Sequence, residues 1–405
     1  MISGTIAGIS SFTVYPLGEI IIPRTSYSYY YISYTPSSAA GTMWIRSNST
    51  ATPVSYQLSS YSGMLNFGNS YPQYLSFESC TWSGIETNIP RFNEKCVFSN
   101  CTTLQKADLY KCTSLSFSAF KECRLLSQVR LPVCSYIGMQ VFAFCKSLSH
   151  INLPMCSSIG NGTFGFCFSL SQINLPVCSY IDYAAFTNCK SLTQVSLPMC
   201  SYIAGRGFDN CYSLSQVSLP MCEYIGENAF AYCSSLSQIS LPMCSYIDSR
   251  GFYSCISLSQ VSLLVCSYLS YSAFEDCSSL KQVSLPMCSY IGNNVFNACT
   301  LLSQVSLPVC SYIGDYAFFN CRRLSQVSLP VCSYIGNYVF QNCTSLSTII
   351  IGYSGVCSLG ALAFYNTRIT SSTGSIYVPA SLVGEYKTTG EWRQYNAIIQ
   401  SYPGL

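Results

Sequence analysis

Cysteine is the residue with the most chemical potential in this 405-residue chain, and its spacing is regular. Of the 26 cysteines, 23 lie on an 11-residue grid that runs without a gap from Cys101 to Cys343. Cysteines at this density could bind metal, form disulfides or act as small apolar fillers. Zinc sites favour close pairs such as Cys-x-x-Cys, which the sequence does not contain.

Disulfides along the grid are also unfavourable. Equivalent cysteines stacked about 4.8 Å apart would point in parallel, so their Cβ atoms would stay beyond the roughly 3.8 Å that a bridge prefers. The grid therefore favours two columns of buried free thiols, with no metal and no cofactor, which suits a reducing compartment. The off-grid Cys80, Cys96 and Cys357 give no readable pattern.

Other side chains with catalytic potential are few and scattered. The single histidine, His150, stands where almost every other repeat has Gln, and no nucleophile–base–acid set can be drawn around it. The neighbouring Glu275 and Asp276 lie at a variable position and are expected to be solvated. No Gly-rich phosphate loop or EF-hand loop is present. We therefore predict no enzyme and no catalytic residues.

The cysteine grid belongs to a repeat of 22 residues, because its two cysteine classes have different neighbours. The unit Cys277–Ala298 reads CSSLKQVSLPMCSYIGNNVFNA, and positions are numbered here from Cys277 as 0. The same frame fits ten consecutive units over residues 123–342 and, more weakly, residues 101–122. A decayed copy is expected at Ser79–Asn100, and Cys343 opens a last, stretched unit.

The pattern within a unit predicts one coil of a solenoid. Val at +6 and Leu at +8 alternate with Gln at +5 and Ser at +7, which indicates a short strand with its apolar side chains inward. Pro at +9 ends the strand, Gly at +15 permits the turn, and Phe at +19 fills the far end of the coil. A unit this small buries its apolar face only against its neighbours, so we expect a β-rich stack of about 11–12 coils.

The units resemble the BspA-like (treponemal) class of leucine-rich repeats. The shared signature appears in Phe230, Cys233, Leu236, Ile239, Leu241 and Pro242, and it continues in Ile291, Gly292, Val295 and Phe296. The usual family has a small aliphatic residue near +11, where this chain has Cys throughout. The resemblance implies a leucine-rich repeat solenoid that works by binding, commonly as a surface adhesin.

Three domains are expected. Residues 1–95 form an N-terminal β domain or cap, residues 96–365 the solenoid, and residues 366–405 a C-terminal cap. Tyr30–Pro36 and Thr42–Asn48 indicate two strands around a turn and weakly resemble a bacterial Ig-like domain; an irregular β cap is the alternative. Within 380–400 we expect a short helix that shields the last coil.

Three columns of side chains recur on the outside of the coils. Gln at +5 and Ser at +7 could bind a glycan or another β layer, or could simply be a solvated ladder. Tyr at +13 recurs from Tyr136 to Tyr334, with Ser158 breaking the run, and its rings are expected to stack and leave hydroxyls toward water. Stacking alone or binding would each explain that column.

The sites of recognition are expected where the units differ, at +16, +17, +20, +21, +1 and +2. These positions wrap one corner of the coil, and we call them the corner strip. Aromatic and cationic residues favour recognition, whereas neutral drift on a solvent-facing turn would also produce variation. The candidate binding residues are Tyr183, Arg206, Tyr212, Arg250, Tyr253, Tyr271, Tyr316 and Tyr338.

Composition limits the partners. Charged residues make up 9% of the chain and its net charge is +3, so no basic stripe exists for nucleic acid. No stretch approaches the roughly 20 apolar residues that membrane insertion needs. The start, MISGTIAGISSF, shows no signal peptide.

We therefore expect a non-enzymatic binding or adhesion protein on a virion or cell surface, with a protein or glycan as partner. The missing leader favours a virion or another assembly put together in the cytoplasm. Low charge weakens repulsion between copies, so a self-assembling structural subunit is the alternative.

Overall fold

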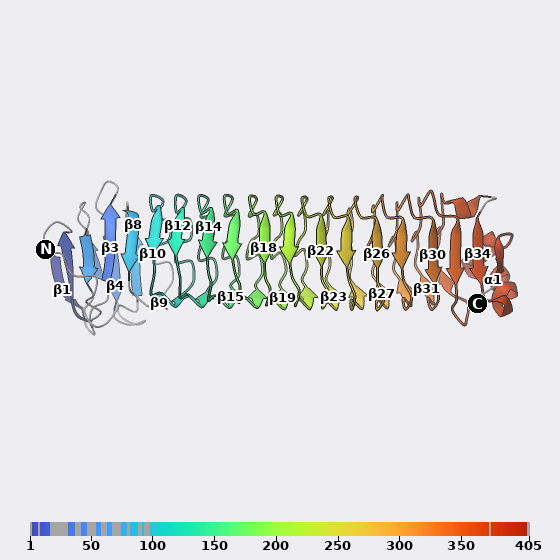
Figure 1. Ribbon diagram of the computed structural model, residues 1–405, viewed down its shortest axis with the longest axis horizontal. Coiled ribbons are helices and arrows are strands. Elements are labelled where there is room, and N and C mark those ends of the chain that lie inside the picture. The colour runs from blue at the N-terminus through green and yellow to red at the C-terminus, as the bar shows by residue number, and fades with distance from the viewer. Residues whose placement is uncertain are drawn as a thin grey trace. The chain divides into compact units, whose positions relative to one another are not determined.

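The computed structural model describes residues 98–371 and 374–402, together with the backbone of nine strands before residue 93. The chain forms two compact units, Met1–Leu197 and Pro198–Leu405, each described by itself. Within each unit the strands of successive coils lie side by side (Figure 1). In both units, strands of successive coils pair in parallel with a 22-residue offset. The predicted leucine-rich repeat solenoid is confirmed.

The first unit begins with antiparallel strands in two sheets. β3 pairs with β6 and β8, whereas β4 pairs with β5 and β7. The strands expected near residues 30 and 42 are thus present but in different sheets; the side chains of residues 1–97 lie outside the described residues, and the Ig-like assignment stays a prediction. The strands are β1 (Ile2–Ile6), β2 (Ile9–Pro16), β3 (Tyr31–Pro36), β4 (Thr42–Arg46), β5 (Val54–Gln57), β6 (Gly63–Asn66), β7 (Tyr74–Glu78), β8 (Trp82–Thr87) and β9 (Arg91–Phe92).

The solenoid ladder starts at β8, which pairs in parallel with β10 so that Gly84 lies opposite Lys106. This pairing is the one expected of a decayed copy at Ser79–Asn100. Each later coil of the first unit contributes a three-residue strand at +5 to +7 and a two-residue strand at +13 to +14. In the first unit these are β10 (Lys106–Asp108), β11 (Ser114–Leu115), β12 (Gln128–Arg130), β13 (Tyr136–Ile137), β14 (His150–Asn152), β15 (Ser158–Ile159), β16 (Gln172–Asn174), β17 (Tyr180–Ile181) and β18 (Gln194–Ser196).

The second unit is built from coils of the same kind and ends in a cap. Its coil strands are β19 (Tyr202–Ile203), β20 (Gln216–Ser218), β21 (Tyr224–Ile225), β22 (Gln238–Ser240), β23 (Tyr246–Ile247), β24 (Gln260–Ser262), β25 (Tyr268–Leu269), β26 (Gln282–Ser284), β27 (Tyr290–Ile291), β28 (Gln304–Ser306), β29 (Tyr312–Ile313), β30 (Gln326–Leu329), β31 (Tyr334–Ile335), β32 (Thr348–Ile351) and β33 (Ser358–Leu359). The closing elements are η1 (Arg368–Thr370), β34 (Ser375–Val378), η2 (Ala380–Leu382), α1 (Val383–Thr388), η3 (Gly390–Tyr395) and β35 (Ile399–Ser401).

The cap seals the apolar end of the stack. The short helix expected within 380–400 is α1, and its Tyr386 and the following Trp392 are almost fully buried. Trp392 packs against Phe364, with ring centroids 6.1 Å apart, and its indole N–H donates to the carbonyl of Cys357 at 2.6 Å. The last phenylalanine of the column is therefore covered by an aromatic side chain instead of water.

The core of each coil follows the predicted pattern. In the unit that begins at Cys277, Leu280, Leu285, Cys288, Ile291 and Phe296 all have no exposed surface. The Phe rings of the column at +19 stack from coil to coil. From Phe208 to Phe364 the centroids of successive rings lie 5.2–5.7 Å apart. Burial of such a ring contributes roughly 1.5–3 kcal/mol, which explains why this column does not vary.

Glycine at +15 has a different role from the one predicted. Among the described glycines only Gly162 and Gly390 have positive φ, so the glycines at +15 do not supply a left-handed turn. They permit close approach instead: a Cβ on Gly292 would lie 3.0 Å from the carbonyl oxygen of Leu269 in the neighbouring coil. The sequence prediction was wrong on the cause, although it found the position.

Candidate binding surfaces

The corner strip is built on an unusual backbone. Every described residue at +17 from Ser118 to Tyr338, and every one at +21 from Asn100 to Asn342, has φ between 53° and 63°. This left-handed region is uncommon for residues other than Gly, Asn and Asp. The strained geometry is held because most of these N–H groups donate to the next coil, as when the Arg250 N–H donates to the Tyr271 carbonyl at 2.8 Å.

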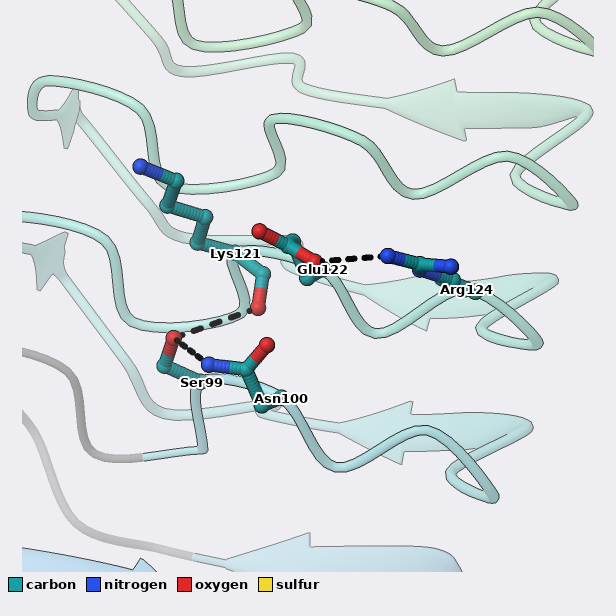
Figure 2. Close-up of polar contacts among 5 residues, drawn as sticks. All are labelled: Ser99, Asn100, Lys121, Glu122 and Arg124. Atoms are coloured by element: carbon teal, nitrogen blue, oxygen red, sulfur yellow. Dashed lines mark hydrogen bonds and ion pairs between the residues drawn. The ribbon is translucent and has the colours of Figure 1, made fainter.

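Figure 2 shows this corner in the first described coils. Ser99 Oγ donates to the Lys121 carbonyl at 3.3 Å, and Asn100 Nδ2 donates to Ser99 Oγ at 3.3 Å. Arg124 forms an ion pair of 2.9 Å with Glu122 in the same turn. The Ser99 side chain therefore reaches the backbone of the next coil, whereas Glu122 and Arg124 pair within one turn.

Packing constrains the strip more than its sequence variability suggests. Ser118 and Ser272, both at +17, have at most 1% of their surface exposed. The recurrent Asn at +21 is the sequence signal that could have revealed the left-handed backbone, since Asn tolerates it best after Gly.

The second unit brings three of the predicted binding residues together. The Arg250 guanidinium lies 5.6 Å from the ring centroid of Tyr253 and 5.6 Å from that of Tyr271 in the next coil. Tyr232 adds an edge-to-face contact with Tyr253 at 5.4 Å. Arg250 and Tyr271 are exposed and Tyr253 is half-buried. This Arg–Tyr cluster places a cation within 5.6 Å of two phenol rings, whereas a binding role for its residues stays a prediction.

A second pair lies in later coils of the same unit. Tyr316 stacks on Tyr338 at 4.8 Å and meets Phe319 edge to face at 5.7 Å. The remaining predicted residues, Tyr183, Arg206 and Tyr212, are exposed at the corner, where the Tyr212 hydroxyl donates to Asn210 Oδ1 at 2.7 Å.

One aromatic and basic cluster in the first unit was not predicted. Phe144 stacks on Phe166 at 4.7 Å, and Phe166 meets Phe168 edge to face at 6.2 Å. The ammonium groups of Lys146 and Lys190 lie 5.5 and 5.3 Å from the Phe168 ring. The recurrence of Phe and Lys at +21 and +1 of consecutive units is the sequence pattern that could have indicated this cluster.

The strand face of the second unit forms a groove of about 1070 Å³. It is lined by the Gln side of β20 to β30, with Ser at +4 and +7 and the edges of the +6 residues; no charged residue lines it. Gln216, Gln238 and Gln260 are exposed, and none of their amides bonds to another part of the described chain. The groove therefore offers a ladder of solvated amides and hydroxyls.

The tyrosine column at +13 stacks as predicted. From Tyr202 to Tyr334, successive rings lie 4.5–5.5 Å apart and within 8° of parallel. The Tyr224 hydroxyl also donates to Asp248 at 2.8 Å. The pKa of Tyr224 is raised, mainly by burial and secondly by this hydrogen bond. Stacking is confirmed, whereas a binding role for the column stays a prediction.

The cysteines are buried, as the grid predicted. All 24 from Cys101 to Cys357 are buried free thiols. Those at position 0 donate to the carbonyl of the Phe 25 residues earlier, as Cys255 does to Phe230 at 3.2 Å, and those at +11 donate two residues ahead. Burial raises the pKa of Cys244 to about 11 and that of Cys255 to about 12, so neither is a nucleophile at neutral pH.

Cys357, which is off the grid in the sequence, belongs to a cysteine column in the structure. It continues the +11 column into the stretched last coil, where its thiol meets that of Cys332, and this hydrogen bond together with burial raises the pKa of Cys357. Three extra residues before it hid the register from sequence analysis.

No catalytic or metal constellation is found in the part of the chain that the structure describes. His150 is exposed on the strand face, where its Nδ1 lies 3.0 Å from Ser149 Oγ. Over the same residues no group of three or more His, Cys, Asp or Glu side chains could hold a metal ion. None of the described helices is long and apolar enough to cross a membrane.

A 22-residue coil with a strand at +5 to +7 and a buried Leu–Cys–Ile–Phe set defines a leucine-rich repeat protein, a class that typically serves in protein interaction. The family described as BspA type leucine rich repeat region, in six copies, matches residues 73–193, 157–280 and 267–382. The chain belongs to this BspA-type leucine-rich repeat family.

Solved structures of similar proteins are bacterial leucine-rich repeat proteins. One from Bacteroides ovatus is 23% identical over 79% of this chain and 96% of its own, with a TM-score of 0.43. The T. pallidum leucine rich repeat protein is 25% identical over 38% and 83%, with a TM-score of 0.34. A leucine rich cell surface protein from Faecalibacterium prausnitzii is 20% identical over 80% and 95%, with a TM-score of 0.38. No curated protein matches the chain.

Proposed function

We propose that this chain is a non-enzymatic binding protein, displayed on a cell surface or virion, that recognises a partner protein or glycan through its corner strip. The observation that carries the proposal is the Arg–Tyr cluster, in which Arg250 lies 5.6 Å from the rings of both Tyr253 and Tyr271. Tyr and Arg are the residues most enriched at binding hot spots.

The solenoid suits this role because its core and the exposed positions of its strip are separate. Phe252 and Leu258 are fully buried and are repeated in nearly every unit, whereas Arg250 and Tyr271 are exposed and change from unit to unit. Variation at the strip therefore alters the surface while the coils keep their stacking.

The test is a triple substitution, Tyr253→Ser, Tyr271→Ser and Tyr316→Ser. The matched control replaces Gln238, Gln260 and Gln304 by Ala, which lie on the strand face of the same three coils. Both proteins, labelled, are applied beside the unchanged chain to a glycan array and to an array of purified cell-surface proteins. We expect the tyrosine variant alone to lose the signals of the unchanged chain while its circular dichroism spectrum stays native; retained signals would refute the role of the strip.

The alternative is a self-assembling structural subunit of a virion or filament. Its support is the low charge of the chain, 9%, and an uncharged groove that a second β layer could fill. Concentration-dependent polymers in sedimentation would favour this function, and a monomer at all concentrations would exclude it.

A further inference from the structure

An exposed apolar ridge runs along the coils at +10, immediately after the proline that ends each long strand. In the second unit every coil from Met199 to Val331 contributes one side chain, and each has 40–57% of its surface exposed. Leu264, which replaces the usual Pro, is 55% exposed and widens the ridge. The ridge residues are Met199, Met221, Met243, Val265, Met287, Val309 and Val331. Apolar side chains exposed singly are ordinary, but an unbroken column of seven marks an interaction surface.

The flank of the ridge can be buried at little cost. Ser at +12 borders it, and these hydroxyls already donate to the neighbouring coil, as Ser267 Oγ does to the Ser245 carbonyl at 3.3 Å. Among the +12 residues only Glu223 is charged. Covering the ridge therefore leaves few polar groups buried without a hydrogen bond. Desolvation of such groups would otherwise oppose binding.

The regularity of the ridge indicates what covers it. Met or Val stands at each coil, so the surface repeats at the coil spacing of about 4.8 Å and offers the same contact seven times. A partner that contacts all seven ridge side chains must present a surface that repeats at the same spacing. The ridge of a second copy of this chain is such a surface. Residues 198–402 hold eight basic and nine acidic side chains, so two copies repel each other little.

We infer that a second copy of this chain docks on the ridge, ridge against ridge, about a two-fold axis. Such an isologous contact pairs the same patch on both copies, and the unbranched Met side chains adapt to the opposing Val residues. Seven rows span about 29 Å. A column one side chain wide is narrower than a standard interface of roughly 800 Å² per partner, so the dimer should exchange with monomer. The inference does not depend on the corner strip.

The experiment is sedimentation equilibrium of the full chain at about 1–100 µM, compared with Met221→Glu, Met243→Glu and Met287→Glu combined. The control places the same three charges on the strand face of the same coils, as Gln216→Glu, Gln238→Glu and Gln282→Glu. A third variant, with Leu at the three Met positions, keeps the ridge apolar.

We expect the unchanged chain, the strand-face control and the Leu variant to approach twice 44.6 kDa as concentration rises. The ridge Glu variant should stay monomeric with a native circular dichroism spectrum. A monomeric unchanged chain overturns the inference, as does a ridge Glu variant that still dimerises. Dissociation by the strand-face control instead would place the contact on the groove. None of these outcomes changes the array result for the strip.

Discussion

The buried thiols make the fold sensitive to alkaline pH. Eighteen of the cysteines carry a pKa raised above the ordinary value of 9.0, and burial is the first cause for all but Cys357. These thiols stay protonated in the folded chain but ionise near pH 9 in the unfolded chain. Their contribution to stability is complete below pH 9 and falls as pH rises through the folded pKa values.

The size of the effect follows from that difference. At pH 10 each such thiol favours the unfolded state by about 1.4 kcal/mol, so eighteen of them shift the balance by about 25 kcal/mol. Folded proteins are ordinarily stable by roughly 5–15 kcal/mol, which is less than this shift. We therefore expect the chain to unfold with a midpoint between about pH 9 and 10.

The assay follows far-ultraviolet circular dichroism and thiolate absorbance together from pH 7 upward, in the presence of a reductant that prevents disulfide formation. Apart from Cys332, whose pKa is lowered by its hydrogen bond with Cys357, the thiols should show thiolate absorbance only as the circular dichroism signal is lost, and the native spectrum should return at pH 7. Ionisation of the eighteen other thiols near pH 9 while the spectrum stays native would refute the reasoning, because these thiols would then be in contact with water.

Three further outcomes are expected. Phe274→Ala should lower the free energy of unfolding in urea by about 3–5 kcal/mol, because it opens a cavity in a stacked column, whereas Phe319→Ala at the half-buried corner should cost clearly less. Gly292→Ala should destabilise the fold by about 1–3 kcal/mol, because the new Cβ would lie 3.0 Å from the Leu269 carbonyl oxygen. The control Gly384→Ala should not destabilise it, because a Cβ there has nothing within 4 Å. Equal unfolding midpoints for the two variants would contradict this account of the glycine at +15. Mild hydrogen peroxide should convert Met155, Met199 and Met287, each 55–57% exposed, to sulfoxides before it oxidises any cysteine from Cys101 to Cys357, as peptide mass spectrometry can report; early cysteine oxidation would show that the thiols are accessible.

The core and its period could be predicted because they are properties of each unit alone. Leu280, Ile291 and Phe296 recur at fixed spacing, and a repeat this short can bury them only by stacking. The two strands per coil follow from the same spacing. The stretched last coil was harder, since three extra residues before Cys357 moved it off the grid although it keeps its place in the column.

The surfaces could be predicted only in part, because they depend on contacts between coils. The side chains of Arg250 and Tyr271 meet because +17 of one coil lies beside +16 of the next, and this required the left-handed backbone at +17 that the varied residue types conceal. The ridge at +10 was overlooked for the opposite reason: Met287 reads as another core residue beside Cys288, and only its exposed side chain distinguishes the two.

The most direct measurement of the central claim is alkylation of the native chain at neutral pH, followed by peptide mass spectrometry. Because both sulfur columns face a dry interior, the 24 cysteines from Cys101 to Cys357 should remain unlabelled until denaturant is added and then react together. Rapid labelling of either column in the folded chain would contradict the stacked-coil account.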